Sequence, residues 1–170
     1  MGLLLQNKRS MKFWKYIFSC ILLLSIACTT NKDLIYGKVV RIADGDTVTL
    51  LVDGNKQLRV RLYGIDCPEN KQDFSQVAKQ FTSDRTAQKD VSVKVMDIDQ
   101  YGRSVGIIYL PDGEILNEEL LKAGLAWHYK QYDQSDRFAN LENEARKNKL
   151  GIWSMKNPLE PWVFRRQNRR

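Results

Sequence analysis

Residues 47–66, TVTLLVDGNKQLRVRLYGID, decide the fold predicted for this chain. The first run, 47–52, is rich in β-branched residues and leads into the letters DGN, which are typical of a hairpin turn. The second run, 57–65, alternates apolar with charged or polar residues, the period-two pattern of a strand that buries one face. The segment therefore predicts two antiparallel strands joined by a tight turn.

The chain on either side of this hairpin predicts three more strands and about three α-helices. We expect strands at 35–42, 91–96 and 105–110, and helices at 74–88, 116–123 and 135–149. The body has about 130 residues, enough for one domain with a single core. The order of these elements predicts an α+β fold built on a closed, five-stranded antiparallel barrel.

The N-terminal segment has the pattern of an export signal. Basic side chains precede an apolar stretch at 16–27, which is shorter than a typical transmembrane helix. The letters SIA before Cys28 resemble a bacterial lipoprotein cleavage site. We therefore expect a signal peptide at 1–28, a lipid anchor on Cys28 that holds the protein to a membrane of the bacterial cell envelope, and a short linker at 29–34. Simple secretion and an uncleaved anchor are the alternatives.

The formal net charge of +7 comes mainly from the two ends of the chain. Basic residues gather in the export signal and in a C-terminal tail, 156–170, which ends in RRQNRR. The body between them is close to neutral, which excludes a basic surface over the whole domain and limits any binding of polyanions to a local patch. We expect these last six residues, 165–170, to be a solvated end, with contact to phosphates or anionic lipids as the alternative.

Two acids stand where predicted strands meet turns, Asp46 before the hairpin and Asp66 after it. Calcium takes oxygen ligands from carboxylates and backbone carbonyls, so these side chains and the carbonyl of Cys67 form a candidate metal site. Glu69 is placed to hold a water molecule and to act as a general base. The alternative is that these acids only cap turns. A thiolate zinc site is excluded, because the body holds only Cys67 and one histidine, His128.

Two arginines and two tyrosines are candidates for binding a substrate. Arg61 lies on the predicted hairpin and Arg103 follows a turn, and a guanidinium offers two parallel donors to a phosphate while staying charged. Tyr129 and Tyr132 are candidates to stack on nucleic-acid bases. The alternatives are surface charge for the arginines and core packing for the tyrosines.

Four blocks of this sequence resemble the staphylococcal (micrococcal) nuclease family and stand in the same order. They are DGDT at 44–47, RLYGIDCPE at 61–69, DQYGR at 99–103 and GLAW at 124–127. The resemblance continues to LGIW at 150–153 and covers most of residues 35–153. It implies an OB-fold barrel with helices, in a nuclease-like domain at 35–155, and calcium-dependent cleavage of DNA and RNA.

The resemblance implies a set of metal ligands. Asp46 and Asp66 are similar to the calcium carboxylates of the family, and the backbone carbonyl of Cys67 is similar to its third ligand. The chain departs from the family in having Cys67 where Thr is common, a change that matters little if only the carbonyl binds. The segment at 70–77 is also shorter than the corresponding loop of the family, which bears on substrate preference.

The resemblance further implies catalytic roles. Glu69 is similar to the residue that holds the attacking water, and Arg61 and Arg103 are similar to the guanidiniums that neutralise the phosphate as charge builds on it. We therefore expect an exported, lipid-anchored, monomeric nuclease that depends on calcium and acts on DNA and RNA, single strands preferred. The alternative is a catalytically inactive OB-fold lipoprotein that binds nucleic acid, against which the joint presence of the acids and arginines argues.

Overall fold

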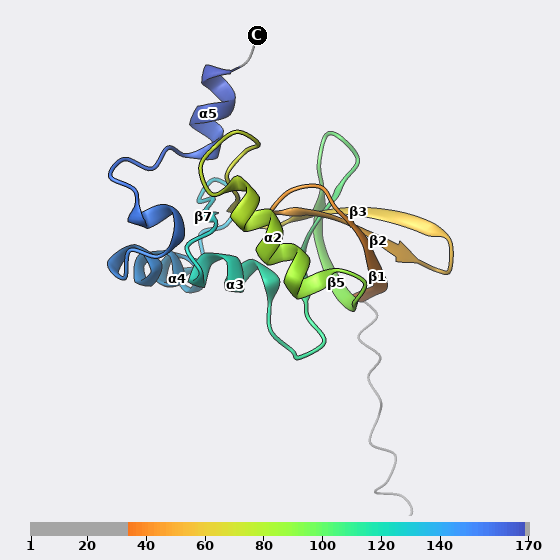
Figure 1. Ribbon diagram of the computed structural model, residues 1–170. Helices are drawn as coiled ribbons and strands as arrows, with labels where there is room; N and C mark the ends of the chain where they lie inside the picture. Colours follow the sequence, from red (N-terminus) through yellow and green to blue (C-terminus); the bar gives the residue numbers. More distant parts are fainter. Residues whose placement is uncertain (1–33, 169–170) are drawn as a thin grey trace, which may run out of the picture. The chain divides into compact units, whose positions relative to one another are not determined.

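The structure is a computed structural model that describes residues 34–168. Five strands close into a barrel in the order β1-β2-β3-β6-β5 (Figure 1). They are β1 (Leu34–Ile42), β2 (Thr47–Val52), β3 (Lys56–Leu62), β5 (Asp90–Ile98) and β6 (Ser104–Tyr109). The expected α+β class and five-stranded OB-type barrel are therefore confirmed.

The hairpin of β2 and β3 forms as the sequence predicts. The two strands are antiparallel, with Thr47 opposite Arg61 and Val48 opposite Val60. In β3 the apolar side of the alternation is buried, Val60 and Leu62 facing the core, while Arg59 is exposed and Arg61 is partly covered. The period-two pattern thus separates the residues of the core from those of the opposite face.

One pair of strands in the barrel is parallel, which corrects the expected all-antiparallel barrel. Strands β3 and β6 run in the same direction, with Arg61 opposite Val105, whereas the other four neighbouring pairs are antiparallel. The reason is geometric. Each antiparallel contact reverses the strand direction, so a closed ring with an odd number of strands must contain at least one parallel contact.

The third strand ends earlier than predicted, because the backbone turns at Gly64. Its φ of 71° is left-handed, and an added Cβ would lie 2.8 Å from the Cβ of Asp133, so that only glycine fits. After this turn, β4 (Ile65–Asp66) pairs antiparallel with β7 (Trp127–His128) in a separate two-stranded sheet. Asp66 lies opposite Trp127, so an acid from the first half of the chain meets an aromatic segment from the second.

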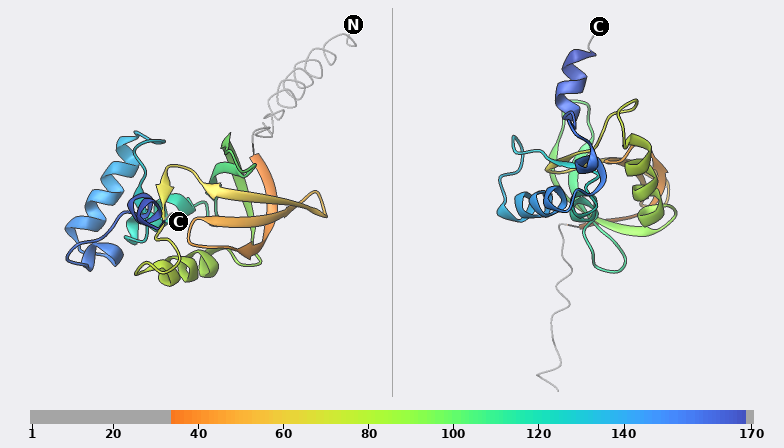
Figure 2. Two further views of the ribbon diagram at one scale, coloured as in Figure 1. Left: turned by 90° about the horizontal axis from the view of Figure 1, so that it is seen from above. Right: turned by 60° about the vertical axis from the view of Figure 1, so that its left-hand side comes forward.

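Four α-helices and one short 3-10 helix complete the described residues. They are α2 (Ser75–Thr86), α3 (Leu116–Lys122), α4 (Asp136–Lys147), η1 (Gly151–Ser154) and α5 (Pro161–Gln167). The first three α-helices are those predicted, and Figures 1 and 2 show α4 on the side of the domain opposite the β2–β3 hairpin, while α3 contacts β6 of the barrel. Helix α5 includes residues 165–167, the start of the stretch expected to be a solvated end, so that expectation is wrong for these residues.

The apolar side chains form two buried clusters. The larger cluster fills the barrel and the space between it and the helices, where α3 contacts both α2 and α4. The smaller cluster joins Trp127, Ala145, Ile152 and Trp153, with Trp162 of α5 packed against it. This second cluster sets the position of α5 beside β7.

The export signal at 1–28, with Cys28, lies outside the described residues, as does nearly all of the linker at 29–34. These boundaries, and those of the domain at 35–155 and the tail at 156–170, stay predictions. Among residues 34–168 we find no helix that combines the length and the apolar character needed to cross a membrane.

Candidate active site

One arginine bridges two buried carboxylates from different strands. Arg61 of β3 places Nη1 2.8 Å from Oδ1 of Asp46, which directly precedes β2, and Nη2 2.5 Å from Oδ1 of Asp66, at the end of β4. The pairing of Thr47 with Arg61 aligns the first contact, and the turn at Gly64 brings Asp66 back to complete the second. A single cation therefore contacts both acids.

Backbone groups hold Asp46 in this position. Its Oδ2 accepts a hydrogen bond from the backbone N–H of Cys67 at 2.8 Å, and its carbonyl accepts from the N–H of Leu62 at 2.8 Å. Asp44 also contributes, since its Oδ1 accepts from the N–H of Asp46 at 3.1 Å. Two strands and a turn thus orient one carboxylate, as a functional acid requires.

A second arginine reaches the same acids from the C-terminal helix. Arg165 of α5 places Nη1 3.1 Å from Oδ1 and Nη2 2.9 Å from Oδ2 of Asp66. Its Nη1 also lies 2.6 Å from Oε1 of Glu69, so the expected catalytic carboxylate joins the cluster. Asp66 is completely buried, whereas the side chains of Glu69 and Arg165 are 36% and 33% exposed. Arg165 therefore covers the outer side of the site.

The acids of the site resist ionising together. Burial raises the pKa of Asp44 to about 6, and the charge of Asp46 adds to the rise. Burial also raises the pKa of Asp66, and Asp46 adds to this rise, although hydrogen bonds from Arg165 oppose it. The charge of Asp46 raises the pKa of Arg61 above its usual range, against the effect of burial. Positive charge is thus needed at this place to keep the carboxylates ionised.

The donor set fits a hard cation such as calcium. Asp46 and Asp66 offer carboxylate oxygens, which calcium prefers, and the two Nη atoms of Arg61 contact one acid each, so the two carboxylates lie on either side of one guanidinium. Among residues 34–168 no three His, Cys, Asp or Glu side chains lie together so that they could hold a metal ion, so a calcium ion here would also need oxygens of the backbone. In this structure the guanidiniums of Arg61 and Arg165 supply the positive charge instead.

Arg103 makes its contacts within its own hairpin. Its Nε lies 2.6 Å from Oδ2 of Asp99, and its guanidinium lies over the ring of Tyr101 at 5.6 Å. The parallel register nevertheless brings it close, because Val105 pairs with Arg61 and Arg103 lies two residues before Val105. Two residues of a strand span about 7 Å on one face. The structure thus places Arg103 next to the acid–arginine cluster without joining it to the cluster.

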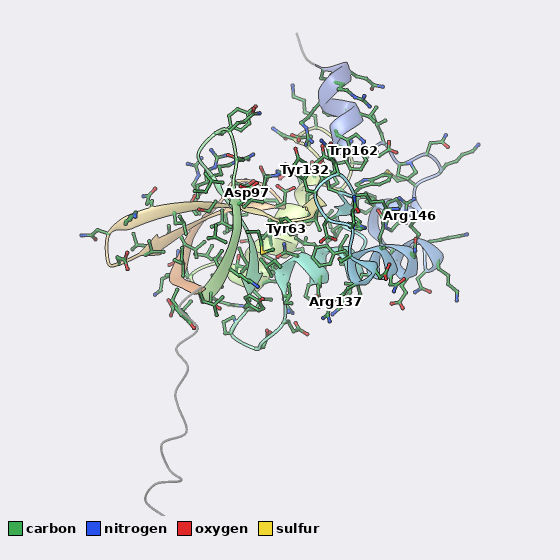
Figure 3. All side chains as sticks on the ribbon, turned by 180° about the vertical axis from the view of Figure 1, so that it is seen from behind. Tyr63, Asp97, Tyr132, Arg137, Arg146 and Trp162 are labelled. Carbon is green, nitrogen blue, oxygen red and sulfur yellow. The ribbon has the colours of Figure 1, made fainter. Side chains whose placement is uncertain are left out.

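The two candidate stacking tyrosines contact each other and α5. The rings of Tyr129 and Tyr132 meet edge to face with centroids 4.9 Å apart, and the hydroxyl of Tyr63 donates to the carbonyl of Tyr132 at 2.6 Å (Figure 3). Tyr129 stacks on Trp162 with an interplanar angle of 6° and a centroid distance of 4.9 Å. Tyr132 is well exposed, whereas one face of Tyr129 is covered by Trp162.

Two residues of this site, Arg165 and Trp162, were not found from the sequence. The sequence does contain one signal for the start of helix α5. Pro161 follows Glu160, and proline is favoured in the first turn of a helix. The sequence could therefore have indicated α5, but not its contacts. The ion pairs of Arg165 join residues 96 and 99 positions apart, which no local pattern reports.

The closed five-stranded barrel places this protein in the class of OB-fold proteins. Within that class it carries a cluster of charged side chains, Arg61 with Asp46 and Asp66, beside the barrel. A family model described as "Staphylococcal nuclease homologue" matches residues 59–155, more than half of the chain. The chain therefore belongs to the staphylococcal nuclease family. The match includes Arg61, Asp66, Glu69 and Arg103, while Asp46 precedes it.

Several bacterial proteins are similar to this chain over most of their length. A protein of Escherichia coli O157:H7 named "Uncharacterized endonuclease" is 42% identical over 131 residues, which cover 77% of this chain and 85% of that protein. A protein of the same name from Haemophilus influenzae is 39% identical over a match that covers 84% of this chain and 79% of that protein. A "Micrococcal nuclease" of Shigella flexneri is 38% identical over a match that covers 78% of this chain and 82% of that protein.

Proposed function

We propose that this protein is a calcium-dependent nuclease that hydrolyses phosphodiester bonds of DNA and RNA. The observation that carries the proposal is the contact of Arg61 with both Asp46 and Asp66, beside Glu69. Membership of a nuclease family and the relatives named endonuclease and micrococcal nuclease support it. Buried acids that share a cation, next to a more exposed acid, are the parts that metal-assisted hydrolysis needs.

In this proposal Asp46 and Asp66, with the backbone carbonyl of Cys67, hold the calcium ion. When bound, calcium supplies positive charge that stabilises the negative oxygens of the phosphate. Arg61 keeps a further positive charge between the same strands, where it is suited to neutralise the phosphate as charge develops. Arg103, directly before the neighbouring strand β6, supplies a second guanidinium of the same kind.

Glu69 is the proposed group that orients the attacking water and accepts its proton. Its backbone N–H donates to Oε1 of Gln72 at 2.8 Å, which fixes the loop that carries it. Its side chain is partly exposed, unlike Asp66, so water reaches it while the loop holds its position. Tyr129 and Tyr132 are the proposed stacking residues for a base of a single-stranded substrate.

We further propose that the protein is exported and held by a lipid on Cys28. The support is the sequence pattern of residues 1–28 alone. Growth with a radioactive fatty acid should label the wild-type protein, and Cys28→Ala should remove the label. Equal labelling of the two proteins would overturn the anchor and leave the nuclease proposal unaffected.

The nuclease proposal is tested with the full-length chain in detergent, given single-stranded DNA or RNA in millimolar calcium. Cleavage should occur, stop with a calcium chelator, and fall about a hundredfold or more in Arg61→Ala. Arg59→Ala is the matched control, because Arg59 lies on the same strand and face but is exposed. Binding of nucleic acid without cleavage would favour the inactive binding protein instead.

A further inference from the structure

The C-terminal helix occupies the places that a substrate and its metal would need. We propose that α5 is an autoinhibitory element, which closes the site with Arg165 and Trp162 and leaves when calcium and nucleic acid bind. The inference rests on the proposed function. It assigns a regulatory role to the segment 159–167.

Arg165 blocks the acids by direct contact. Its two Nη atoms lie 2.9 and 3.1 Å from the two carboxylate oxygens of Asp66, and one of them lies 2.6 Å from Glu69. Arg61 contacts only Oδ1 of Asp66, whereas Nη2 of Arg165 lies on Oδ2, so a calcium ion cannot bind this second oxygen while the guanidinium of Arg165 is there. Both Nη atoms are engaged by carboxylates, so in this state Arg165 is a competitor of the cation.

Trp162 covers the proposed base-stacking surface. It lies parallel to Tyr129, with ring centroids 4.9 Å apart, which is the arrangement that a stacked base would adopt. Trp162 and Arg165 are three residues apart in α5 and therefore project from one side of the helix. The same helix thus covers a stacking surface and an acid pair, the two parts of a nucleotide-binding site.

The segment is tied to the loop that carries Glu69. The carbonyl of Leu159 accepts a hydrogen bond from Nε2 of Gln72 at 2.9 Å, while Oε1 of Gln72 accepts from the N–H of Glu69. Gln72 therefore links the start of the inhibitory segment to the catalytic loop. A displacement of α5 removes this link together with the ion pair of Arg165.

Helix α5 is short and mostly unburied, so its position depends on contacts that ligands can replace. Of its seven residues only Pro161 is buried, and a helix of this length has little stability of its own in water. A cavity of about 220 Å³ lies between this segment and the loop after Asp66, with Pro68, Leu159 and Phe164 among its lining residues. Two side chains attach the helix: Trp162 packs on Trp127 and Tyr129, and Arg165 binds Asp66 and Glu69.

Calcium and nucleic acid both favour the open state. Calcium competes with Arg165 for Asp66, and a base competes with Trp162 for Tyr129. A ligand that needs the open state binds with an apparent Kd equal to its intrinsic Kd divided by the open fraction. A variant that releases α5 should therefore bind calcium more tightly even when no nucleic acid is present.

The test measures calcium binding by calorimetry on the full-length chain in detergent, without nucleic acid. We expect Arg165→Ala to bind calcium about tenfold more tightly than the wild type. Trp162→Ala should also bind more tightly, about threefold, although Trp162 touches neither acid and carries no charge. Arg166→Ala is the control for a lost positive charge in the same helix and should change the affinity little.

A second measurement follows α5 itself. Amide hydrogen exchange at residues 161–167 should speed up in the wild type when calcium is added and be fast in both variants without calcium. Unchanged calcium affinity in Trp162→Ala, or α5 amides insensitive to calcium, would overturn the autoinhibition. The same holds if Arg165→Ala loses cleavage at saturating calcium, because Arg165 would then act on the substrate.

Failure of the proposed function gives a different pattern. If wild type and variants cleave nucleic acid at saturating calcium but have equal calcium affinities, only the autoinhibition is wrong. If none of the proteins binds calcium or cleaves, the proposed function is wrong and this inference falls with it.

Discussion

Nη1 of Arg61 lies 2.8 Å from Oδ1 of Asp46, and the residue after Asp46, Thr47, is the one that pairs with Arg61 across the β2–β3 hairpin. The register of two neighbouring strands therefore builds the first half of the site. Asp66 joins from beyond the turn at Gly64, and one guanidinium then serves two acids.

Arg61→Ala should destabilise the fold as well as remove activity. The change leaves Asp46 and Asp66 buried without the cation that they share, and breaking a buried pair in this way costs about 3 kcal/mol. Urea unfolding at neutral pH measures the loss, and millimolar calcium should restore part of it. Arg59→Ala, an exposed change on the same strand, should cost less than about 0.5 kcal/mol. Equal losses in the two variants would contradict the shared-cation arrangement.

Asp99→Asn should weaken the fold at neutral pH but not in acid. Burial alone would raise the pKa of Asp99, but hydrogen bonds from Arg103 and Tyr101 outweigh it and leave the pKa below the ordinary 3.8. A lowered folded-state pKa gives stability above pH 3.8, which is lost as the pH falls through the folded-state value. Because this ion pair is only partly buried and is screened by solvent, we expect about 0.5 kcal/mol at pH 7 in thermal unfolding.

The outcome that contradicts this prediction is a difference between Asp99→Asn and wild type that grows as the pH is lowered. Asp97→Asn is the matched control on the same hairpin. Its carboxylate accepts only from the neighbouring N–H of Ile98 and contacts no arginine among the described residues, so its effect should be smaller.

Gly124→Ala should be strongly destabilising. An added Cβ would lie 2.3 Å from the carbonyl oxygen of Leu150, and the carbonyl of Gly124 accepts from the N–H of Ile152 at 2.9 Å. The left-handed φ of 65° adds backbone strain, so we expect a loss of about 3 kcal/mol or more in urea unfolding. Gly113→Ala shares the left-handed strain but meets no atom within 4 Å, and should cost about 1 kcal/mol.

Cys67 should resist alkylation in the folded protein. It is buried, and burial together with the charges of Asp46 and Asp66 raises the pKa of its thiol well above the usual value. Iodoacetamide at neutral pH should leave the peptide that contains Cys67 unmodified, as measured by mass spectrometry. The same treatment in concentrated guanidinium should modify it fully. Rapid labelling of the folded chain would show that the thiol is exposed.

The sequence predicts this fold well where the structure obeys local rules. The β2–β3 hairpin, the alternation along β3 and the helices α2, α3 and α4 follow from side-chain periodicity and turn residues. Local rules also place Asp46 and Asp66 at the ends of strands, where their side chains are free to converge. The predicted third strand, 57–65, is longer than β3, because alternation alone does not show the close approach of Asp133 to Gly64.

Two features of the candidate site could not be predicted from local patterns. A basic tail usually remains solvated, yet residues 161–167 form a helix because Trp162 packs against Trp127 and Tyr129. Arg103, expected among the catalytic guanidiniums, is bound by Asp99 four residues away, a pair that the spacing allows but does not require.

By itself, the sequence determined the strands of the barrel, the helices α2, α3 and α4, the resemblance to the staphylococcal nucleases, and three candidates, Asp46, Asp66 and Arg61, that the structure brings together. These follow from periodicity, turn chemistry and motif order, which act over a few residues. A closed ring of five strands has to contain a parallel pair, but this rule does not say which pair it is. Only the tertiary structure decided that it is β3 and β6. Only the tertiary structure brought Arg165 to Asp66, 99 residues away, because that contact depends on how the second aromatic cluster packs.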